Sequence, residues 1–540
     1  MSRRYDDRLQ RGLDVPIDAQ FGDRGDDAGI EYTDVVVVGA GVSGIGAAYR
    51  LQESNPRLTY TVLDRRDRIG GTWDLFRYPG IRSDSDIFTL SFPWEPWVRA
   101  ESIAQGDAIQ QYLTDTAAKH GIDRHIQFGV HVHTANWDSN SDMWTLEATQ
   151  DGRPRRFQCR FVFFGTGYYS YDDPYTPDFP GLGSFAGKVV HPQHWPTNLD
   201  YAGKRVVIIG SGATAISMAP ALTQDAGSVT LLQRSPGYLM SQREFNPLND
   251  IIRKVLPTQS AHTAVRWVNI FLTLMVYYFC RMAPKASRNV VRRTAVKSLP
   301  EGYDVDVHFK PSYDPWDQRF VVALDFDFYK AVSDGRIEVV TDHIERFDSH
   351  GIVLRSGRRI DADVVITATG LQLQSLGGVR LVIDGVEVKP NERWAYKSFL
   401  LSDVPNLAWC IGYVNASWTL RADMTARAFA RLVAHMSANG YTRGYPTLGN
   451  EVLTEKPTFD LESGYVMRSG RQLPKSGRKR PWLVRHNFLA DLVDFRFDRI
   501  EESMVFTRFG DTSTLPAWSA LTYGTVQMHN HWPRSAGTRP

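Results

Sequence analysis

The chain has 540 residues, of which 42% are hydrophobic, enough to form the cores of two or three domains. A formal net charge of +2 and the absence of a basic recognition motif argue against a nucleic-acid-binding protein. Cys159, Cys280 and Cys410 are too far apart in sequence for a disulfide framework or a metal cluster, which favours a reducing, cytoplasmic environment.

The first 30 residues are rich in Arg, Asp and Gly and contain no apolar segment that would form a secretory signal. They are expected to be a mobile extension, and residues 516–540 are expected to form a polar C-terminal tail. The folded part is therefore expected between residues 31 and 515.

A dinucleotide-binding pattern begins the folded part. The apolar strand 34–38 (DVVVV) leads into Gly39, Gly41 and Gly44 of a GxGxxG motif that opens a helix and includes Ser43. Glycines permit a tight turn and a close approach of a pyrophosphate to the helix N-terminus. A second strand ends at Asp64, 20 residues after Gly44, where a carboxylate accepts a hydrogen bond from a ribose hydroxyl. Together these features predict an FAD-binding fold.

The pattern recurs from residue 204. Strand 204–209 (KRVVII) leads into GSGATA and a helical stretch, and a further strand, SVTLLQR, ends without an acid. An arginine at that end pairs with a 2′-phosphate that a carboxylate would repel, although it is also compatible with an ordinary surface cation. This fold is expected to bind NADPH rather than NADH through Gly210, Ser211, Gly212, Ala213, Thr214, Ala215, Ile216, Gln233 and Arg234.

Two apolar segments, residues 161–167 (FVFFGTG) and 363–370 (DVVITATG), each end in small residues. Small residues let the backbone pass close to a ligand or to another chain segment. Either segment alone is compatible with an ordinary strand exit. Their recurrence after each nucleotide-binding pattern indicates crossings between the two folds.

Residues 240–320 are expected to form a helical insertion. Within it, residues 267–280 (WVNIFLTLMVYYFC) are shorter than the roughly 20 residues that span a bilayer, and basic residues follow up to Lys297. The segment fits a buried helix with a solvated basic continuation. It also fits a helix on an anionic membrane surface, so that peripheral membrane contact through 267–297 is the second interpretation.

Two further motifs connect the nucleotide-binding patterns. Residues 185–196 (FAGKVVHPQHWP) follow an F-x-G-x-x-x-H-x-x-x-W-P pattern, and residues 70–84 read GGTWDLFRYPGIRSD. No CxxC motif is present, which excludes the disulfide reductases that share two such folds. With LPEGYDV, DPWDQR and NASWTL further along, the chain resembles the Baeyer–Villiger or class B flavoprotein monooxygenases from about residue 33 to about residue 500. Within this family it is most similar to the ethionamide-activating subgroup.

The resemblance implies an α/β fold with two Rossmann-like domains that bind FAD and NADPH. It implies an FAD-binding domain in two parts, 31–180 and 375–515, around an NADP-binding domain at 181–374. The implied reaction inserts one oxygen atom from O2 beside a ketone carbonyl through a C4a-peroxyflavin, yielding an ester from a small lipophilic ketone. The same intermediate could oxygenate a sulfide, thioamide or amine, and a flavoprotein that senses NADPH without catalysis is the third interpretation.

The resemblance also implies residue roles. Arg319 would stabilise the negative charge of the oxygen adduct, because a guanidinium stays charged at any working pH, and Asp84 would orient it. Gln318 stands where relatives often carry a lysine for the 2′-phosphate, which leaves Arg234 as the main anchor. His191 and Trp195 are interpreted as linker residues rather than as a general base. The remaining expected cofactor contacts are Thr72, Trp73, Asp74 and Leu75 for FAD and Arg82 and Ser83 for NADP. Asp84 and Val132 are also expected to contact a cofactor.

Overall fold

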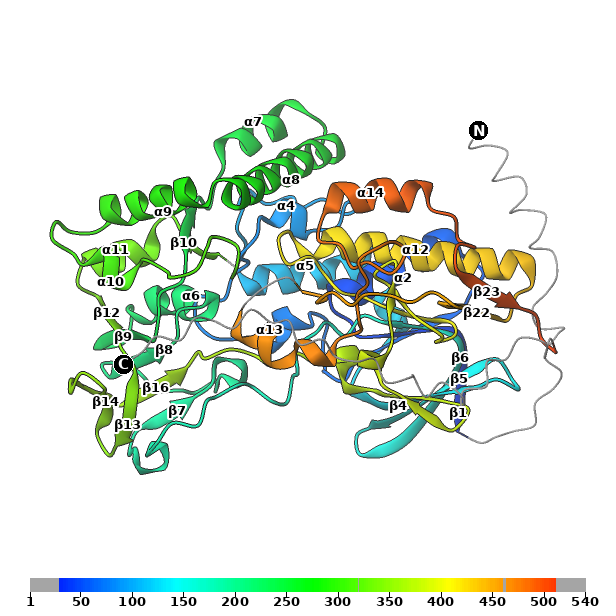
Figure 1. The fold of residues 1–540 in the computed structure, drawn as a ribbon, viewed down its shortest axis with the longest axis horizontal. Coiled ribbons are helices and arrows are strands. Elements are labelled where there is room, and N and C mark those ends of the chain that lie inside the picture. Colours follow the sequence, from blue (N-terminus) through cyan, green and yellow to red (C-terminus); the bar gives the residue numbers. More distant parts are fainter. Residues whose placement is uncertain (1–28, 319, 460–462, 511–540) are drawn as a thin grey trace.

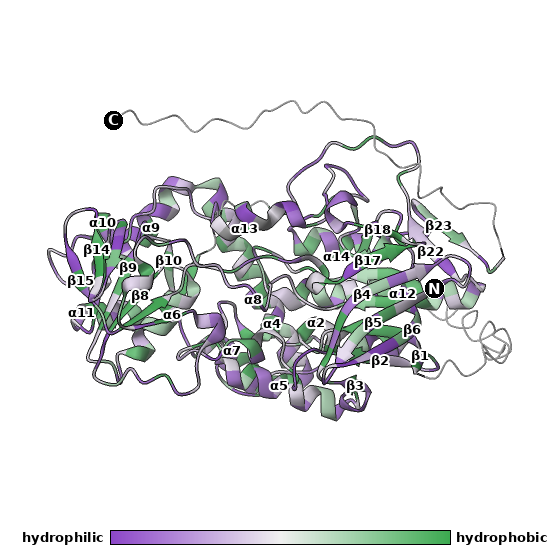
Figure 2. Cartoon of the chain, turned by 90° about the horizontal axis from the view of Figure 1, so that it is seen from below, coloured by the Kyte–Doolittle hydropathy of each residue, from purple (hydrophilic) through white to green (hydrophobic). Residues whose placement is uncertain are grey.

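The computed structural model describes residues 29–318, 320–459 and 463–510. Two units lie at opposite ends of an elongated molecule, one built on a mixed sheet with a parallel centre and the other on a parallel sheet (Figure 1). Hydrophobic residues concentrate in the strands of both sheets (Figure 2). The predicted α/β class with two dinucleotide-binding folds is confirmed.

The first sheet has strand order β18-β17-β4-β5-β6-β1-β2-β3, and β21 also pairs with β6. Its centre is β1 (Ile30–Val38), which lies parallel to β2 (Tyr60–Leu63) and β6 (Arg153–Phe164). The run Val35–Val37 is completely buried, as expected for a parallel strand covered on both faces. The other strands are β3 (Ile126–Gln127), β4 (Val130–Asp138), β5 (Met143–Gln150), β17 (Arg380–Ile383), β18 (Val386–Val388), β19 (Ala395–Tyr396), β20 (Leu400–Leu401) and β21 (Leu407–Trp409). The helices of this unit include α2 (Val42–Ser54), α3 (Thr72–Leu75), α4 (Ile87–Leu90), α5 (Gly106–Lys119) and α12 (Trp418–Asn439).

The second sheet is fully parallel, with strand order β12-β9-β8-β16-β7. Its strands are β7 (Lys188–Val190), β8 (Arg205–Ile209), β9 (Ser228–Gln233), β12 (Ile337–Thr341) and β16 (Val364–Thr367). Helices α6 (Ala213–Leu222) and α11 (Asp327–Ser333) contact each other beside it, and a small antiparallel sheet follows β12. That small sheet comprises β13 (Ile344–Asp348), β14 (Gly351–Leu354) and β15 (Arg359–Asp361).

The predicted helical insertion is present between two short parallel strands, β10 (Leu239–Gln242) and β11 (Val321–Leu324). It consists of α7 (Pro247–Val255), α8 (Thr258–Met282), α9 (Pro284–Ser298) and α10 (Val305–His308). Figure 1 shows α7, α8 and α9 along one edge of the molecule, where α14 (Phe488–Phe497) lies beside α8. The insertion therefore extends from the second unit across the first.

The chain crosses between the two sheets twice. It leaves the first sheet after Phe164 and enters the second at Lys188, and it returns between Thr367 and Arg380. The two crossings pair with each other, since Ser170 N donates to Gln372 O at 2.9 Å and Gln374 N donates to Tyr168 O at 2.9 Å. The small-residue segments 161–167 and 363–370 feed directly into these crossings.

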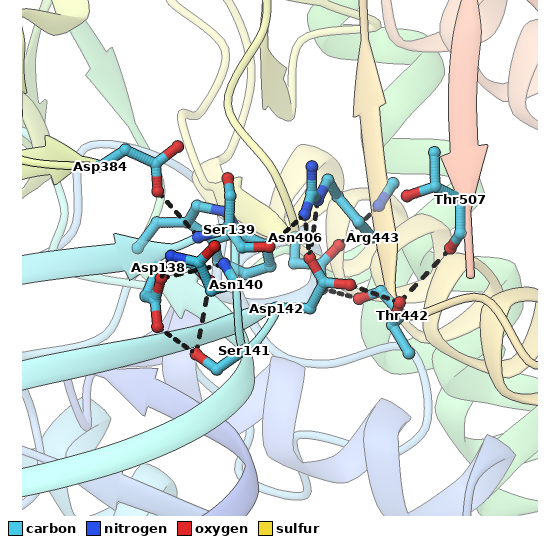
Figure 3. A network of polar contacts seen from close by, with 12 residues as sticks. Asp138, Ser139, Asn140, Ser141, Asp142, Asp384, Asn406, Thr442, Arg443 and Thr507 are labelled. Atoms are coloured by element: carbon cyan, nitrogen blue, oxygen red, sulfur yellow. Dashed lines mark hydrogen bonds and ion pairs between the residues drawn. The ribbon is translucent and has the colours of Figure 1, made fainter. Parts of the chain in front are cut away.

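The C-terminal part of the chain adds to the first unit a two-stranded antiparallel sheet of β22 (Arg443–Pro446) and β23 (Met504–Thr507). Figure 3 shows how β22 is fixed. Arg443 Nε donates to Asp142 Oδ1 at 2.7 Å, Thr442 Oγ1 donates to Asp142 Oδ2 at 2.6 Å, and Asn406 Nδ2 donates to the Thr442 carbonyl at 2.8 Å. Arg443 and Asp142 are both buried, so breaking this pair would leave an uncompensated buried charge.

Candidate active site

A cavity of about 1780 Å³, including its open mouth, lies where the two dinucleotide-binding folds meet. Its wall combines the N-terminus of α2, the end of β2, the start of α3 and the start of β4 with the first crossing and the N-terminus of α6. Several predicted site residues from distant parts of the sequence meet there: Gly39, Gly41, Ser43, Asp64, Thr72, Trp73, Arg82, Ser83, Asp84, Val132, Ala213 and Thr214.

The glycine-rich turn of the first fold is sterically fixed. Gly39 has φ of +106°, and a Cβ there would lie 2.8 Å from the Gly165 carbonyl oxygen, while a Cβ at Gly44 would lie 1.7 Å from Gly39 O. Gly165 belongs to the predicted small-residue crossing, which explains why both segments need small residues. Gly44 itself does not line the cavity, so it serves the turn rather than the ligand.

Asp64 follows β2 at the cavity wall. Its Oδ2 accepts from Ala40 N at 2.6 Å and its Oδ1 accepts from Arg66 N at 2.8 Å. Burial raises the pKa of this carboxyl, while the two backbone donors act against the shift. Each oxygen keeps a second lone pair, so the carboxylate can still accept from a ribose hydroxyl.

The segment 70–84 forms the contact between the two folds. A Cβ at Gly71 would lie 3.1 Å from Gly41 Cα in the first fold. A Cβ at Gly80 would lie 2.3 Å from the Ser217 carbonyl oxygen in α6 of the second fold. The glycines of this motif thus allow the segment to fit between the glycine-rich turn before α2 and helix α6.

Two of the predicted cofactor contacts, Asp74 and Leu75, do not line the cavity. Thr72 and Trp73 line the cavity, but Asp74 is fully buried and forms ion pairs with Arg66 and Arg77. Leu75 packs in the core that includes α6. Because α3 is a single helical turn, its first two residues face the cavity and the next two face away.

Asp84 lies in the cavity wall beside Arg82 and Ser83, and Ser83 Oγ accepts from Ala104 N at 3.3 Å. Arg82 Nη1 donates to Asp327 Oδ2 at 2.6 Å, which joins the wall to α11 of the second fold. Arg319, the predicted catalytic cation, lies outside the described residues. Its role remains a prediction from the sequence.

In the second fold, Ala213 and Thr214 at the start of α6 reach the cavity, whereas Ser211, Ala215 and Ile216 do not. A Cβ at Gly210, where φ is +138°, would lie 2.3 Å from the Ala368 carbonyl oxygen. This contact repeats the one between Gly39 and Gly165. A Cβ at Gly212 would meet nothing within 4 Å, so open space lies beside the backbone at the N-terminus of α6.

The two residues at the end of β9 differ in placement. Gln233 is buried, and its Nε2 donates to His308 O at 2.8 Å and to Thr341 Oγ1 at 2.9 Å. Its side chain joins β9 to α10 and β12, and the contact of Gln233 with the cofactor stays a prediction. Arg234 is exposed, as a contact to a bound 2′-phosphate requires.

His191 has the geometry of a linker residue. Its Nδ1 accepts from Gln193 N at 3.1 Å, which leaves Nε2 to donate to Gly370 O at 3.2 Å in the second crossing. Burial lowers the pKa of His191 to about 4, so the ring is neutral at pH 7. A Cβ at Gly187 would lie 2.4 Å from Asp363 O, so this motif fixes β7 against β16.

Comparisons with known proteins agree with this geometry. The sequence model of the pyridine nucleotide-disulphide oxidoreductases matches residues 36–266. The FAD-containing monooxygenase EthA of Mycobacterium tuberculosis is 45% identical over 474 residues, covering 87% of this chain and 97% of EthA. The probable FAD-binding monooxygenase AlmA of Acinetobacter baylyi is 42% identical over 474 residues, covering 87% of this chain and 95% of AlmA.

Solved structures share the fold. A steroid monooxygenase bound to NADP superposes with a TM-score of 0.71 at 20% identity, covering 88% of this chain and 100% of that one. An open structure of cyclohexanone monooxygenase gives a TM-score of 0.65 at 21% identity, covering 78% of this chain and 90% of that one. The chain belongs to the class B flavin-dependent monooxygenases. The family and the enzyme class predicted from the sequence are confirmed.

The match to disulphide oxidoreductases reflects the nucleotide-binding folds rather than thiol chemistry. Cys159, Cys280 and Cys410 are all free and buried. Burial raises the pKa of the Cys410 thiol to about 11, so it is not a thiolate at neutral pH. A class B monooxygenase does not need the redox-active pair of cysteines that the disulphide oxidoreductases use.

Sequence reasoning missed an aromatic wall of this monooxygenase. Tyr168, Tyr169, Tyr171, Tyr413 and Trp418 line the cavity, and the rings of Tyr168 and Trp418 stack with centroids 4.9 Å apart. Trp418 Nε1 donates to Ser43 Oγ at 2.8 Å, across 375 residues of sequence. The aromatic run 168–171 (YYSY) directly after GTG could have indicated this wall from the sequence. The NASWTL segment, which contains Trp418, contributes to the family resemblance but does not indicate that Trp418 lines the cavity.

The residues present fit two dinucleotides. Gly41 and Gly212 are the N-cap residues of α2 and α6, so neither helix has a side-chain cap, and neither has an acidic residue in its first turn. Their N–H groups and partial positive charges suit a pyrophosphate each. The flat aromatic wall between them suits a planar ring system.

Proposed function

We propose that this class B monooxygenase uses NADPH and O2 to convert a lipophilic ketone into an ester, with FAD as its cofactor. The observation that carries the proposal is the meeting of both glycine-rich helix N-termini at one cavity, with Asp84 in its wall. Bound FAD supplies the activation of O2 there. The aromatic and apolar lining suits a lipophilic substrate and keeps water from the reacting atoms.

The residues of this chain have distinct parts in the proposal. The first turn of α2 and the carboxylate of Asp64 hold the pyrophosphate and a ribose of FAD. The first turn of α6 holds the pyrophosphate of NADPH, and Arg234 pairs with its 2′-phosphate. Arg319, oriented by Asp84, stabilises the negative charge that develops on the ketone oxygen.

Product analysis under ¹⁸O2 tests this function. Purified protein with FAD and NADPH is given a linear ketone and, separately, an aryl sulfide. The expected result is an ester that contains one ¹⁸O atom. Sulfoxide without ester would make heteroatom oxygenation the reaction, and NADPH oxidation without either product would overturn oxygenation.

Two substitutions test the charge argument. Arg319→Ala should lower ester formation by at least about 100-fold while NADPH still reduces the flavin, because a preorganised cation at a developing anion contributes several kcal/mol. Arg319→Lys is the control that keeps the charge but loses the planar fork, and it should retain part of the activity. Unchanged ester yield in Arg319→Ala would contradict the assignment.

A further inference from the structure

Helix α8 buries three polar side chains among the apolar residues of its inner face. His262, Arg266 and Asn269 are buried, and Arg266 Nη1 donates to the carbonyl oxygens of Phe88, Thr89 and Ser91 at 2.9, 3.1 and 2.7 Å. These bonds satisfy the C-terminal end of α4 and anchor α8 to the first unit. The face of α8 toward the protein is therefore partly polar.

The opposite face of α8 is apolar and exposed. Trp267, Phe271, Met275, Phe279 and Met282 follow one another at spacings of three or four residues, which places them on one side of the helix. Phe271 is 61% exposed and Met282 is 82% exposed. The outer face of a helix on a protein surface is normally polar.

Neighbouring helices extend this surface. On α7, Leu248, Ile251 and Val255 are exposed at helical spacing, and on α14 Leu492, Val493 and Phe497 are exposed. Asn487 Nδ2 at the start of α14 donates to Tyr278 Oη of α8 at 2.7 Å, and α7 packs against α8. Figure 1 shows the three helices along the same edge. We refer to the exposed apolar residues of these three helices as the α7–α8–α14 face.

Positive charge borders this face. Between residues 241 and 298 the only acidic residues are Glu244 and Asp250. Three arginines of the segment pair with acids outside it, namely Arg281, Arg288 and Arg292 with Asp317, Asp314 and Asp306. The remaining exposed basic residues are Arg243, Lys254, Lys285, Arg293 and Lys297. The whole chain has a net charge of only +2, so this concentration is local.

We infer that the α7–α8–α14 face docks on the surface of an anionic lipid bilayer. An apolar face bordered by Lys and Arg matches the acyl boundary and the anionic headgroups of such a surface. A second copy of the chain fits less well, because a two-fold interface would bring the same basic border to both partners. Helix α8 is long and apolar enough to cross a membrane, but its buried Arg266 and Asn269 hold it against the protein, so it lies on the bilayer.

The docking face lies close to the cavity. Helix α4 packs beneath α8, and its Leu90 lines the cavity. Tyr413, another lining residue, donates from its hydroxyl to Asp491 Oδ2 of α14 at 2.7 Å. If the proposed oxygenation holds, a lipophilic substrate dissolved in the bilayer reaches the site across this layer, whereas the docking itself does not depend on that reaction.

Vesicle co-sedimentation of the full-length, FAD-loaded protein tests the inference. The vesicles contain phosphatidylcholine alone or phosphatidylcholine with phosphatidylglycerol, and binding is expected to the anionic vesicles. Phe271→Ser should weaken that binding about tenfold, since a buried Phe side chain contributes roughly 1.5–3 kcal/mol. Phe509→Ser is the matched control, because Phe509 is 62% exposed but lies outside the face, and it should bind like the parent. Absence of binding to anionic vesicles, or equal loss in both variants, would overturn the inference.

A second experiment removes the basic residues that border the face. The triple variant Lys285→Gln, Arg293→Gln, Lys297→Gln should lose at least about tenfold in binding to anionic vesicles, because each basic residue near the surface contributes roughly 1 kcal/mol. The control Arg153→Gln, Arg355→Gln, Lys479→Gln removes the same charge from elsewhere and should have no comparable effect. If the parent does not bind vesicles and Phe271→Ser changes the oligomeric mass, the face is an interface with a second copy of the chain. That outcome would overturn the proposal that the face docks on a bilayer.

Discussion

Arg82 and Asp327 join the two nucleotide-binding folds through an ion pair, with Arg82 Nη1 2.6 Å from Asp327 Oδ2. The side chain of Arg82 is 7% exposed, so the pair is largely shielded from water. Asp327 Oδ1 also accepts from Leu324 N and Phe328 N, at 3.0 and 2.8 Å, which fixes the carboxylate at the start of α11. The pair therefore couples the cavity wall to the fold that we assign to NADPH.

A double-mutant cycle with Arg82→Met and Asp327→Asn should give a coupling free energy of about 1–3 kcal/mol for unfolding, because the pair is close and partly buried. Denaturant unfolding of the two single variants and the double variant measures this value. Additive effects would mean that the pair does not couple the folds. KM for NADPH should rise in both single variants.

Two glycines of the same motif should respond in opposite ways. Gly210→Ala should destabilise the protein and lower Tm, because its Cβ would lie 2.3 Å from the Ala368 carbonyl oxygen at a φ of +138°. Gly212→Ala should keep Tm within a few degrees, since its Cβ meets nothing within 4 Å, yet raise KM for NADPH severalfold by crowding the pyrophosphate. Equal losses of Tm in the two variants, or an unchanged KM for NADPH in Gly212→Ala, would contradict the assignment of NADPH to the N-terminus of α6.

Arg234 should decide the choice between NADPH and NADH. Arg234→Ala should raise KM for NADPH about tenfold or more while leaving KM for NADH nearly unchanged, since a charge-assisted pair contributes roughly 1.5–3 kcal/mol. Steady-state NADPH and NADH oxidation measures the ratio. Arg153→Ala, an exposed arginine of the first sheet, is the control and should leave the ratio as it is. A parallel rise for both nucleotides would contradict the contact with the 2′-phosphate.

Acid should destabilise the protein through His262. Burial, and then the charge of Arg266, lower the pKa of His262 from 6.5 to about 4. The unfolded chain therefore binds the proton at a higher pH than the folded chain, so the stability from neutral His262 is present above pH 6.5 and is lost as pH falls towards 4. Its contribution is on the order of 2 kcal/mol.

Urea unfolding at pH 7.5, 6 and 5 checks this pH dependence. His262→Gln keeps a donor for the Phe92 carbonyl, which His262 Nε2 contacts at 3.0 Å, but it cannot titrate. The variant should therefore lose less stability than the parent between pH 7.5 and 5. The same slope in both proteins would assign the acid sensitivity to other groups, such as His486, whose pKa burial lowers to about 3.

Local patterns predict most of the nucleotide-binding architecture. Strand, glycine turn and terminal acid are adjacent in sequence, so Gly39, Gly41 and Asp64 can be placed from the sequence alone. The side chains of Asp74 and Gln233, both predicted as cofactor contacts, do not line the cavity, because sequence position does not say which way a side chain points in a short helix or at a strand end. The contacts of Trp418 with Ser43 and of Gly80 with α6 join distant segments, and one sequence does not reveal which segments meet.

The paired crossings constrain how the two units move. The backbones of Tyr168 and Ser170 are hydrogen-bonded to those of Gln374 and Gln372. The two connections therefore form one short two-stranded link rather than two independent linkers. These hydrogen bonds oppose sliding of one connection along the other and their separation. His191 is hydrogen-bonded to Gly370, which lies beside this link, so a movement of the second unit carries this histidine and the segment after β16 together. A movement of one crossing is therefore transmitted to the other, while the Arg82–Asp327 pair and the contact of α8 with α4 restrain the same two units at other points.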